Sequence, residues 1–100
     1  MKIGTISLGN ASLHLGHSQV VPPTLRGHAR EITEFNVPEK FRGKGEGTEL
    51  LKEVCEQADN DKILLILKAD TERLENYYKR FDFITFQRDN AILMARKPKI

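Results

Sequence analysis

The chain has little cysteine, and this limits its covalent and metal chemistry. Its single cysteine, Cys55, cannot form an internal disulfide bond, and no cysteine pair is present for a structural zinc site. Because a chain without disulfides suits a reducing compartment, we expect a cytoplasmic location. No apolar run approaches the roughly 20 residues that a membrane-spanning helix needs. The N-terminal residues also lack the apolar segment of a secretory signal peptide, so we expect no membrane partner and no secretion.

Acidic residues are missing from the first 30 positions. All 14 Asp and Glu residues lie from Glu31 onward, whereas the first 30 residues carry Lys2, two arginines and three histidines. The net charge is nevertheless only +2, which does not by itself indicate nucleic acid binding. The interleaving of aromatic and basic residues that marks a nucleic acid surface is also lacking. These features argue against a nucleic-acid-binding domain.

Repeats, low-complexity tracts and long linkers are absent as well, so residues 1–100 are expected to form one domain. Alternating patterns predict strands over residues 2–8, 12–21 and 27–37, and a hairpin-like pair over 83–87 and 91–96. The continuous apolar run at 63–67 predicts a strand covered on both faces. The chain is therefore rich in predicted strands at both ends.

Two segments between these strands have helical spacing. The first spans residues 47–58, and its apolar stripe consists of Leu50, Leu51, Val54, Cys55 and Ala58. The second spans residues 71–80 and can be capped by Asp70 or Thr71. The strand–helix–strand order in the middle implies a right-handed crossover with parallel pairing, and antiparallel strands on both sides.

Three glycines alternate over five residues in the segment Arg42-Gly43-Lys44-Gly45-Glu46-Gly47-Thr48. This segment lies between a predicted strand and a predicted helix. Glycine lets the backbone turn sharply and lets a ligand come close. The helix N-terminus that follows offers unpaired N–H groups and the positive end of a dipole. The segment therefore predicts a site for a phosphate or pyrophosphate.

The spacing of these glycines separates three families of phosphate site. The P-loop pattern Gly-x-x-x-x-Gly-Lys-Ser/Thr fails because Lys44 lies between glycines, and no acidic metal-binding strand follows. The dinucleotide pattern Gly-x-Gly-x-x-Gly fails at its last interval. The pattern Arg/Gln-x-x-Gly-x-Gly/Ala at the start of a helix matches Arg42 to Gly47 directly.

With this pattern the chain resembles the GNAT superfamily of acyl-CoA-dependent N-acyltransferases over about residues 28–97. The family's central strand typically ends in Val-Pro before the loop, as Val37-Pro38 does here. The next helix typically opens Gly-x-x-Leu-Leu, here Gly47-Thr48-Glu49-Leu50-Leu51. A later helix typically ends Phe-Tyr-x-x-x-Gly-Phe, here Tyr77-Tyr78-Lys79-Arg80-Phe81-Asp82-Phe83. The resemblance implies an α+β, α/β/α-like GNAT fold, with a central mixed twisted sheet of about six strands and two main helices.

The chain departs from the family pattern in two places. Asp82 stands where the family usually has glycine, at a position that often needs a left-handed backbone, which Asp tolerates. Family members also usually carry two helices between their first two strands, whereas residues 1–27 have no helical pattern long enough for them. With this reduced N-terminal part, the acceptor side is expected to be open or to be completed by another subunit, as in a homodimer.

The resemblance implies acetyl-CoA as co-substrate and no metal. Backbone N–H groups of the loop are then expected to cradle the CoA pyrophosphate; they belong to Arg42, Gly43, Lys44, Gly45, Glu46, Gly47 and Thr48. The side chains of Arg42 and Lys44 are expected to add positive charge. Backbone groups of Phe35 and Val37 are expected to pair with the amides of the pantetheine arm, like an added strand.

Tyr78 aligns with the family tyrosine that often protonates the departing thiolate of CoA. A thiolate of pKa about 8.5 leaves more easily when a donor is near. A core tyrosine on the apolar face of its helix is the alternative interpretation, and Tyr77 is expected to be a core residue. Cys55 is expected to be packed and inert, so we expect direct transfer rather than a route through an acetylated cysteine.

The acceptor amine arrives mostly as an ammonium ion and must lose a proton before it attacks. Two-residue alternation places Glu31 on the same face as Phe35 and Val37, so we predict Glu31 as the base. Glu34, His28 and a water molecule are the alternatives.

The sequence thus predicts an N-acetyltransferase that moves an acetyl group from acetyl-CoA to a primary amine. The open acceptor side favours a protein lysine or a protein N-terminus, and a small-molecule amine is the alternative acceptor. A non-catalytic CoA-binding or protein-interaction module with the same fold is the rival from another functional class.

Overall fold

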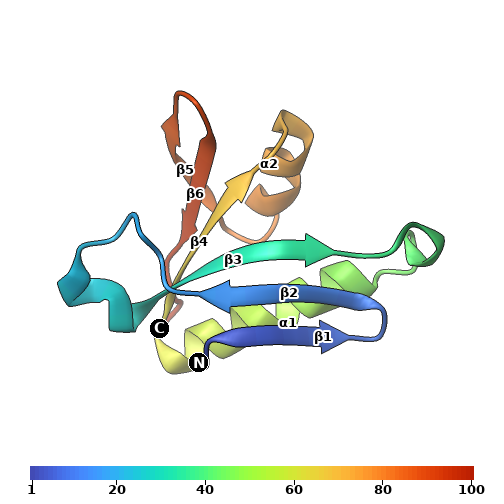
Figure 1. Cartoon of the computed structure of the whole chain (residues 1–100), viewed down its shortest axis with the longest axis horizontal. Helices are drawn as coiled ribbons and strands as arrows, with labels where there is room; N and C mark the ends of the chain where they lie inside the picture. Colours follow the sequence, from blue (N-terminus) through green and yellow to red (C-terminus); the bar gives the residue numbers. More distant parts are fainter.

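A computed structural model describes residues 1–100 as a six-stranded mixed sheet with two α-helices (Figure 1). The strands are β1 (Gly4–Leu8), β2 (Ala11–Gly16), β3 (Ala29–Asn36), β4 (Leu64–Ala69), β5 (Ile84–Arg88) and β6 (Ile92–Arg96). The helices are α1 (Glu46–Asp61) and α2 (Glu72–Lys79), and two 3-10 turns are η1 (Pro23–His28) and η2 (Glu39–Phe41). No helix in the chain is both long enough and apolar enough to pass through a lipid bilayer.

The sheet has the order β1-β2-β3-β4-β6-β5. Its only parallel pair is β3 with β4, and every other neighbouring pair is antiparallel. This confirms the predicted strand–helix–strand crossover in the middle of the chain with antiparallel strands on both sides, and it confirms the predicted α+β fold.

The segment between β2 and β3 differs most from the sequence prediction. Strands were expected over residues 12–21 and 27–37, but β2 ends at Gly16 and residues 23–28 form η1. The two prolines Pro22 and Pro23 explain the difference, because each lacks a backbone donor and has a restricted φ. Proline at the start of η1 instead suits a helical turn.

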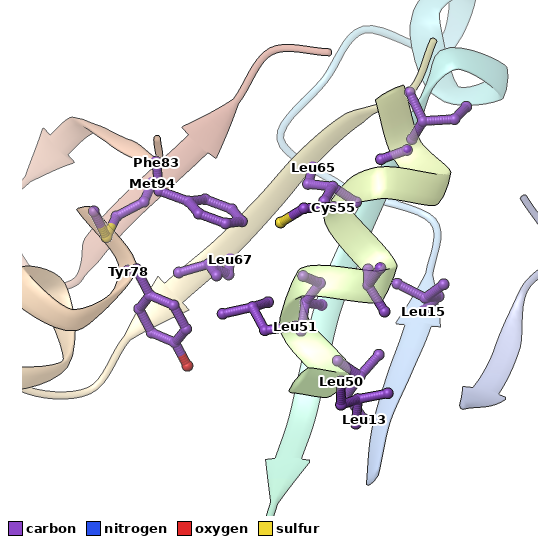
Figure 2. Packing of buried hydrophobic residues seen from close by; sticks show 14 of the residues in the cluster. Leu13, Leu15, Leu50, Leu51, Cys55, Leu65, Leu67, Tyr78, Phe83 and Met94 are labelled. Atoms are coloured by element: carbon purple, nitrogen blue, oxygen red, sulfur yellow. The ribbon is translucent and has the colours of Figure 1, made fainter. Parts of the chain in front are cut away.

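The core lies on one face of the sheet. The predicted stripe of α1 is confirmed, since Leu50, Leu51, Val54, Cys55 and Ala58 are all buried. Figure 2 shows side chains of α1 packed against leucines of β2 and β4, and the same cluster extends to Tyr78 of α2, Phe83 just before β5 and Met94 of β6. Both α-helices pack on this face, so residues 1–100 form two layers, without the second helical layer of an α/β/α arrangement.

Local features of the sequence set the start of α2 and the end of α1. Thr71 caps α2, because its Oγ1 accepts a hydrogen bond from the N–H of Leu74 at 3.1 Å. Helix α1 runs three residues beyond the predicted end, and it stops where Lys62 adopts a left-handed conformation with φ 58°. Asp82 has φ 72°, which confirms the expected left-handed backbone at the family's glycine position.

Strands β3 and β4 pair over only part of their length. Their parallel register ends at the pair Ile32–Leu67. Beyond it β3 continues beside β2, whereas β4 continues beside β6, and the two strands diverge (Figure 1). The end of β3 therefore has backbone groups without a strand partner on the β4 side, and this V-shaped opening positions the site described next.

Candidate active site

A cavity of about 860 Å³ occupies the opening between β3 and β4. Its walls come from four places: the end of β3, the glycine loop with the first turn of α1, the end of β4, and one face of α2. Residues far apart in the sequence therefore meet here because the two central strands separate.

The glycine loop forms one end of this cavity. Gly43 has φ 83° and Gly45 has φ 82°, conformations that favour glycine. Gly45 is also the residue before α1, and no side chain caps this helix. The first N–H groups of α1 are thus without an intrahelical or side-chain partner at the cavity, which suits an anion.

Gly47 is small for a different reason. A Cβ atom placed on it would lie 2.9 Å from Cγ2 of Val37 and 3.5 Å from Cζ of Phe35. The absence of a side chain lets the first turn of α1 approach the end of β3. Only two of the three alternating glycines therefore serve the turn, while the third brings the helix N-terminus close to the strand.

Most of the predicted cofactor residues line the cavity. They are Phe35, Val37, Arg42, Gly43, Gly45, Glu46, Gly47 and Thr48. Lys44 is not among the lining residues, and its Nζ lies 5.8 Å from the ring centroid of Phe41. The structure thus brings the loop and the strand end together as expected, with Lys44 to one side.

Two charged side chains of the loop are already held by protein groups. Nε of Arg42 donates to the carbonyl oxygen of Val37 at 2.9 Å, which ties the loop to the strand end. The Glu46 carboxylate accepts from the backbone and side-chain nitrogens of Asn10, at 3.3 and 3.4 Å, in the turn between β1 and β2. The side chains of Arg42 and Glu46 therefore organise the loop, and its backbone N–H groups are the better candidates for binding a ligand.

Tyr78 lies where the cavity meets the core. It is buried, and its ring centroid is 6.5 Å from Phe35 and 5.9 Å from Phe83 (Figure 2). Its hydroxyl makes no hydrogen bond within the chain, although Tyr78 lines the cavity. Burial raises the pKa of Tyr78 to about 12, with smaller contributions from Tyr77 and Asp70. The hydroxyl therefore stays protonated at neutral pH.

The predicted face of Glu31 is wrong. Glu34 has φ 52°, and between Thr33 and Asn36 the strand β3 contains one residue more than the facing stretch of β2. This bulge reverses the alternation, so Phe35 faces the core together with Ile32. Glu31 therefore points to the opposite face, and it does not line the cavity.

Of the other candidate bases, Glu34 lines the cavity and is exposed. His28 belongs to η1 and does not line it. A bulge that supplies one extra residue thus decides which carboxylate of β3 reaches the opening.

Sequence reasoning missed the polar wall that α2 contributes. Arg73, Tyr77 and Arg80 all line the cavity, and Asp70 lies beside them at the end of β4. The signal was present, because positions 73, 77 and 80 follow the i, i+4, i+7 spacing of one helix face. The prediction from sequence placed Tyr77 in the core and gave Arg73 and Arg80 no role.

A model of the acetyltransferase (GNAT) domain matches residues 3–91. The chain belongs to the GNAT acetyltransferase family. No curated protein sequence matches it.

Solved structures share the fold of this GNAT domain. The PaiA N-acetyltransferase from Thermoplasma acidophilum, in complex with coenzyme A, has a TM-score of 0.65 at 15% identity, covering 87% of this chain and 52% of that chain. The GNAT family N-acetyltransferase YhbS from Escherichia coli, in complex with CoA, has a TM-score of 0.65 at 14% identity, covering 87% and 51%. ElaA from Escherichia coli has a TM-score of 0.64 at 24% identity, covering 87% and 60%. The chain thus spans a little over half the length of these proteins.

Proposed function

We propose that this GNAT domain binds acetyl-CoA in the cavity between β3 and β4 and transfers the acetyl group directly to a primary amine. The observation that carries the proposal is the place of Tyr78. Tyr78 has a hydroxyl without a hydrogen-bond partner in the chain, and it lines the same cavity that begins at the glycine loop. A ligand with a pyrophosphate at one end and a thioester at the other matches both features.

The cavity fits CoA in charge and in backbone chemistry. The N–H groups at the start of α1 suit the pyrophosphate, and the arginines Arg73 and Arg80 add positive charge on the facing wall. The end of β3 offers backbone groups without a strand partner, to which the pantetheine amides can add. CoA complexes among proteins of the same fold support this choice of ligand.

Two residues of the chain each carry out one of the proton transfers. The amine nitrogen forms a bond to the thioester carbon, and the carbon–sulfur bond then breaks. The Tyr78 hydroxyl, which is protonated at neutral pH, donates its proton to the departing thiolate. Glu34 accepts the proton of the attacking amine, because Glu34 lines the cavity and Glu31 does not.

The acceptor that fits best is a lysine or N-terminus of a protein. Within residues 1–100 the two α-helices cover one face of the sheet only, so the acceptor side of the opening has no helical cover. An uncovered approach admits a flexible side chain on a large partner. A small amine is the alternative acceptor, and the experiment below distinguishes it from a protein amine.

The test is turnover of acetyl-CoA, followed by release of free thiol, with a lysine peptide, a peptide with a free N-terminus and a small polyamine as acceptors. Tyr78→Phe is expected to lower kcat by about 100-fold or more, because general acid–base groups contribute at least that much. Glu34→Gln is expected to lower kcat while Glu31→Gln, on the opposite face of the same strand, leaves it unchanged.

Titration calorimetry with CoA completes the test. Tyr78→Phe should bind CoA as the wild type does, since the ring and the loop remain. A wild-type domain that binds CoA but acetylates none of the acceptors would favour a binding module. Full turnover by Tyr78→Phe would remove this tyrosine from the mechanism.

A further inference from the structure

One hydrogen bond joins the two helices across the wall of the cavity. Oγ1 of Thr48, in the first turn of α1, lies 2.9 Å from the hydroxyl oxygen of Tyr77, in the last turn of α2. Both residues line the cavity. The bond therefore connects the end of the cavity that carries the helix N-terminus with the helix that carries Tyr78.

Tyr77 is held from several sides, so its hydroxyl has a defined position. Its ring packs edge-on against Tyr78, at 5.5 Å between centroids, and against Phe81 at 5.3 Å. The guanidinium of Arg80 lies over the same ring at 5.7 Å. A phenylalanine would make these ring contacts equally well. The tyrosine adds only the hydroxyl, and in this structure that hydroxyl bonds Thr48.

We propose that the Thr48–Tyr77 hydrogen bond is a positioning device that sets the distance between the anion-binding end of α1 and the proton donor Tyr78. This inference rests on the proposed function, because it assumes a ligand that touches both ends. Tyr77 and Thr48 are positioning residues, and Tyr78 is the catalytic residue on which they act. Without the bond, α1 and α2 can shift relative to one another, and a bound thioester no longer reaches the Tyr78 hydroxyl as often.

The test uses hydroxyl deletions that keep the shape of each side chain. These are Tyr77→Phe, Thr48→Val and the double variant, with Thr48→Ser as the conservative variant that retains the hydroxyl. Thr5→Val is the matched control, since Thr5 is exposed on β1 and does not line the cavity. The measurements are the Kd for CoA by calorimetry and kcat and KM with acetyl-CoA.

Each deletion is expected to weaken CoA binding about 3- to 10-fold, the effect of one partly buried hydrogen bond. It should also lower kcat, because Tyr78 is then less well placed. The double variant should show the effect of a single deletion, since either change alone removes the bond. Thr48→Ser should restore wild-type values, and Thr5→Val should match the wild type throughout.

If the fold-changes of the two single deletions multiply in the double variant, the inference is overturned. Such a result would mean that each hydroxyl contacts the ligand independently. Wild-type CoA affinity and kcat in both single variants would overturn it as well. A wild type that binds CoA without turnover contradicts only the proposed function, since the calorimetric comparison still decides on the Thr48–Tyr77 bond. A wild type that does not bind CoA contradicts both.

Discussion

The two ends of the β3–β4 pair form a closed region and an open region. At the closed end the strands are hydrogen-bonded, and α1 covers them with fully buried leucines. A buried arginine, Arg96, also meets Asp59 there through two contacts of 2.7 and 3.0 Å. At the open end the strands separate, and single hydrogen bonds and glycines organise a polar cavity.

The domain thus has its packed core at the closed end and its candidate binding site at the open end. Helix α1 spans both regions, because its residues from Leu50 to Ala58 contribute to the core while its first residues, Glu46 to Thr48, line the cavity. Fully buried side chains are concentrated at the closed end, and we therefore expect most of the stability there, whereas the open end keeps polar groups without protein partners. Four measurements test this contrast, and they are given in order of decreasing expected effect.

The largest effect is expected in the core between α1 and the sheet. Leu51 is fully buried under β4, and Leu51→Ala should lower the free energy of unfolding by about 2–5 kcal/mol, because it leaves a cavity. Leu25, half exposed in η1, is the matched control, and Leu25→Ala should change stability by less than about 0.5 kcal/mol. Urea unfolding measures both. Equal effects at the two sites would mean that the closed region does not carry the stability.

The second effect tests the ion pair. Asp59→Asn should cost about 2–3 kcal/mol, somewhat less than a fully buried pair because Asp59 keeps some exposure. The Arg96 hydrogen bonds lower the pKa of Asp59, so the stabilisation is present above the usual carboxyl pKa and disappears as pH falls through the lowered value.

Urea unfolding at neutral and acidic pH therefore checks both the size and the sign. The difference between wild type and Asp59→Asn should shrink in acid. The control is Glu56→Gln, an exposed carboxyl on the same helix, which should show no comparable effect at either pH.

The third effect lies at the junction of the two regions. Gly47→Ala should cost about 1 kcal/mol, because overlap with Val37 is partly offset by the better helix propensity of alanine. The first turn of α1 should also move away from β3, so CoA affinity should fall more than stability does. Gly27→Ala, where nothing lies within 4 Å, is the control. Unchanged CoA binding in Gly47→Ala would separate the close approach from ligand binding.

The smallest effect is a decline of stability with rising pH in alkaline solution. Burial raises the pKa of Cys55 from 9.0 to about 11, so the folded state holds the thiol proton more tightly than the unfolded state. Stability contributed by the neutral thiol is present below pH 9 and declines as pH rises towards 11. Unfolding midpoints between pH 8 and 10 should fall more steeply in the wild type than in Cys55→Ala. Parallel slopes would mean that the thiol ionises equally easily in both states.

Much of the fold could be predicted from the sequence. The stripe of α1, the cap at Thr71, the crossover between β3 and β4 and the left-handed Asp82 all follow from local patterns, and the structure confirms them. The glycine loop likewise predicted a helix N-terminus available to an anion, and in the structure this N-terminus lies at the cavity. Each of these depends on a few neighbouring residues, so a single sequence is enough to identify them.

The placement of the carboxylates could not be predicted in this way. Strict alternation put Glu31 beside Phe35, but the extra residue at Glu34 moved Glu31 to the other face. The hydrogen bond of Tyr77 was also missed, because its partner Thr48 lies 29 positions away. Both depend on how distant segments pack, and the local pattern is the same whether or not the bulge or the contact forms.

Local sequence patterns were therefore sufficient to predict most of the strands, both helices and their order, since backbone propensities and hydrophobic periodicity act over short stretches. Only the tertiary structure decided that β3 and β4 separate after Ile32, that Glu34 and not Glu31 faces the opening, and that α1 meets α2 through Thr48. The physical reason is that strand register and helix packing are set by contacts between residues far apart in the chain, so a site built between diverging strands exists only once those contacts have formed.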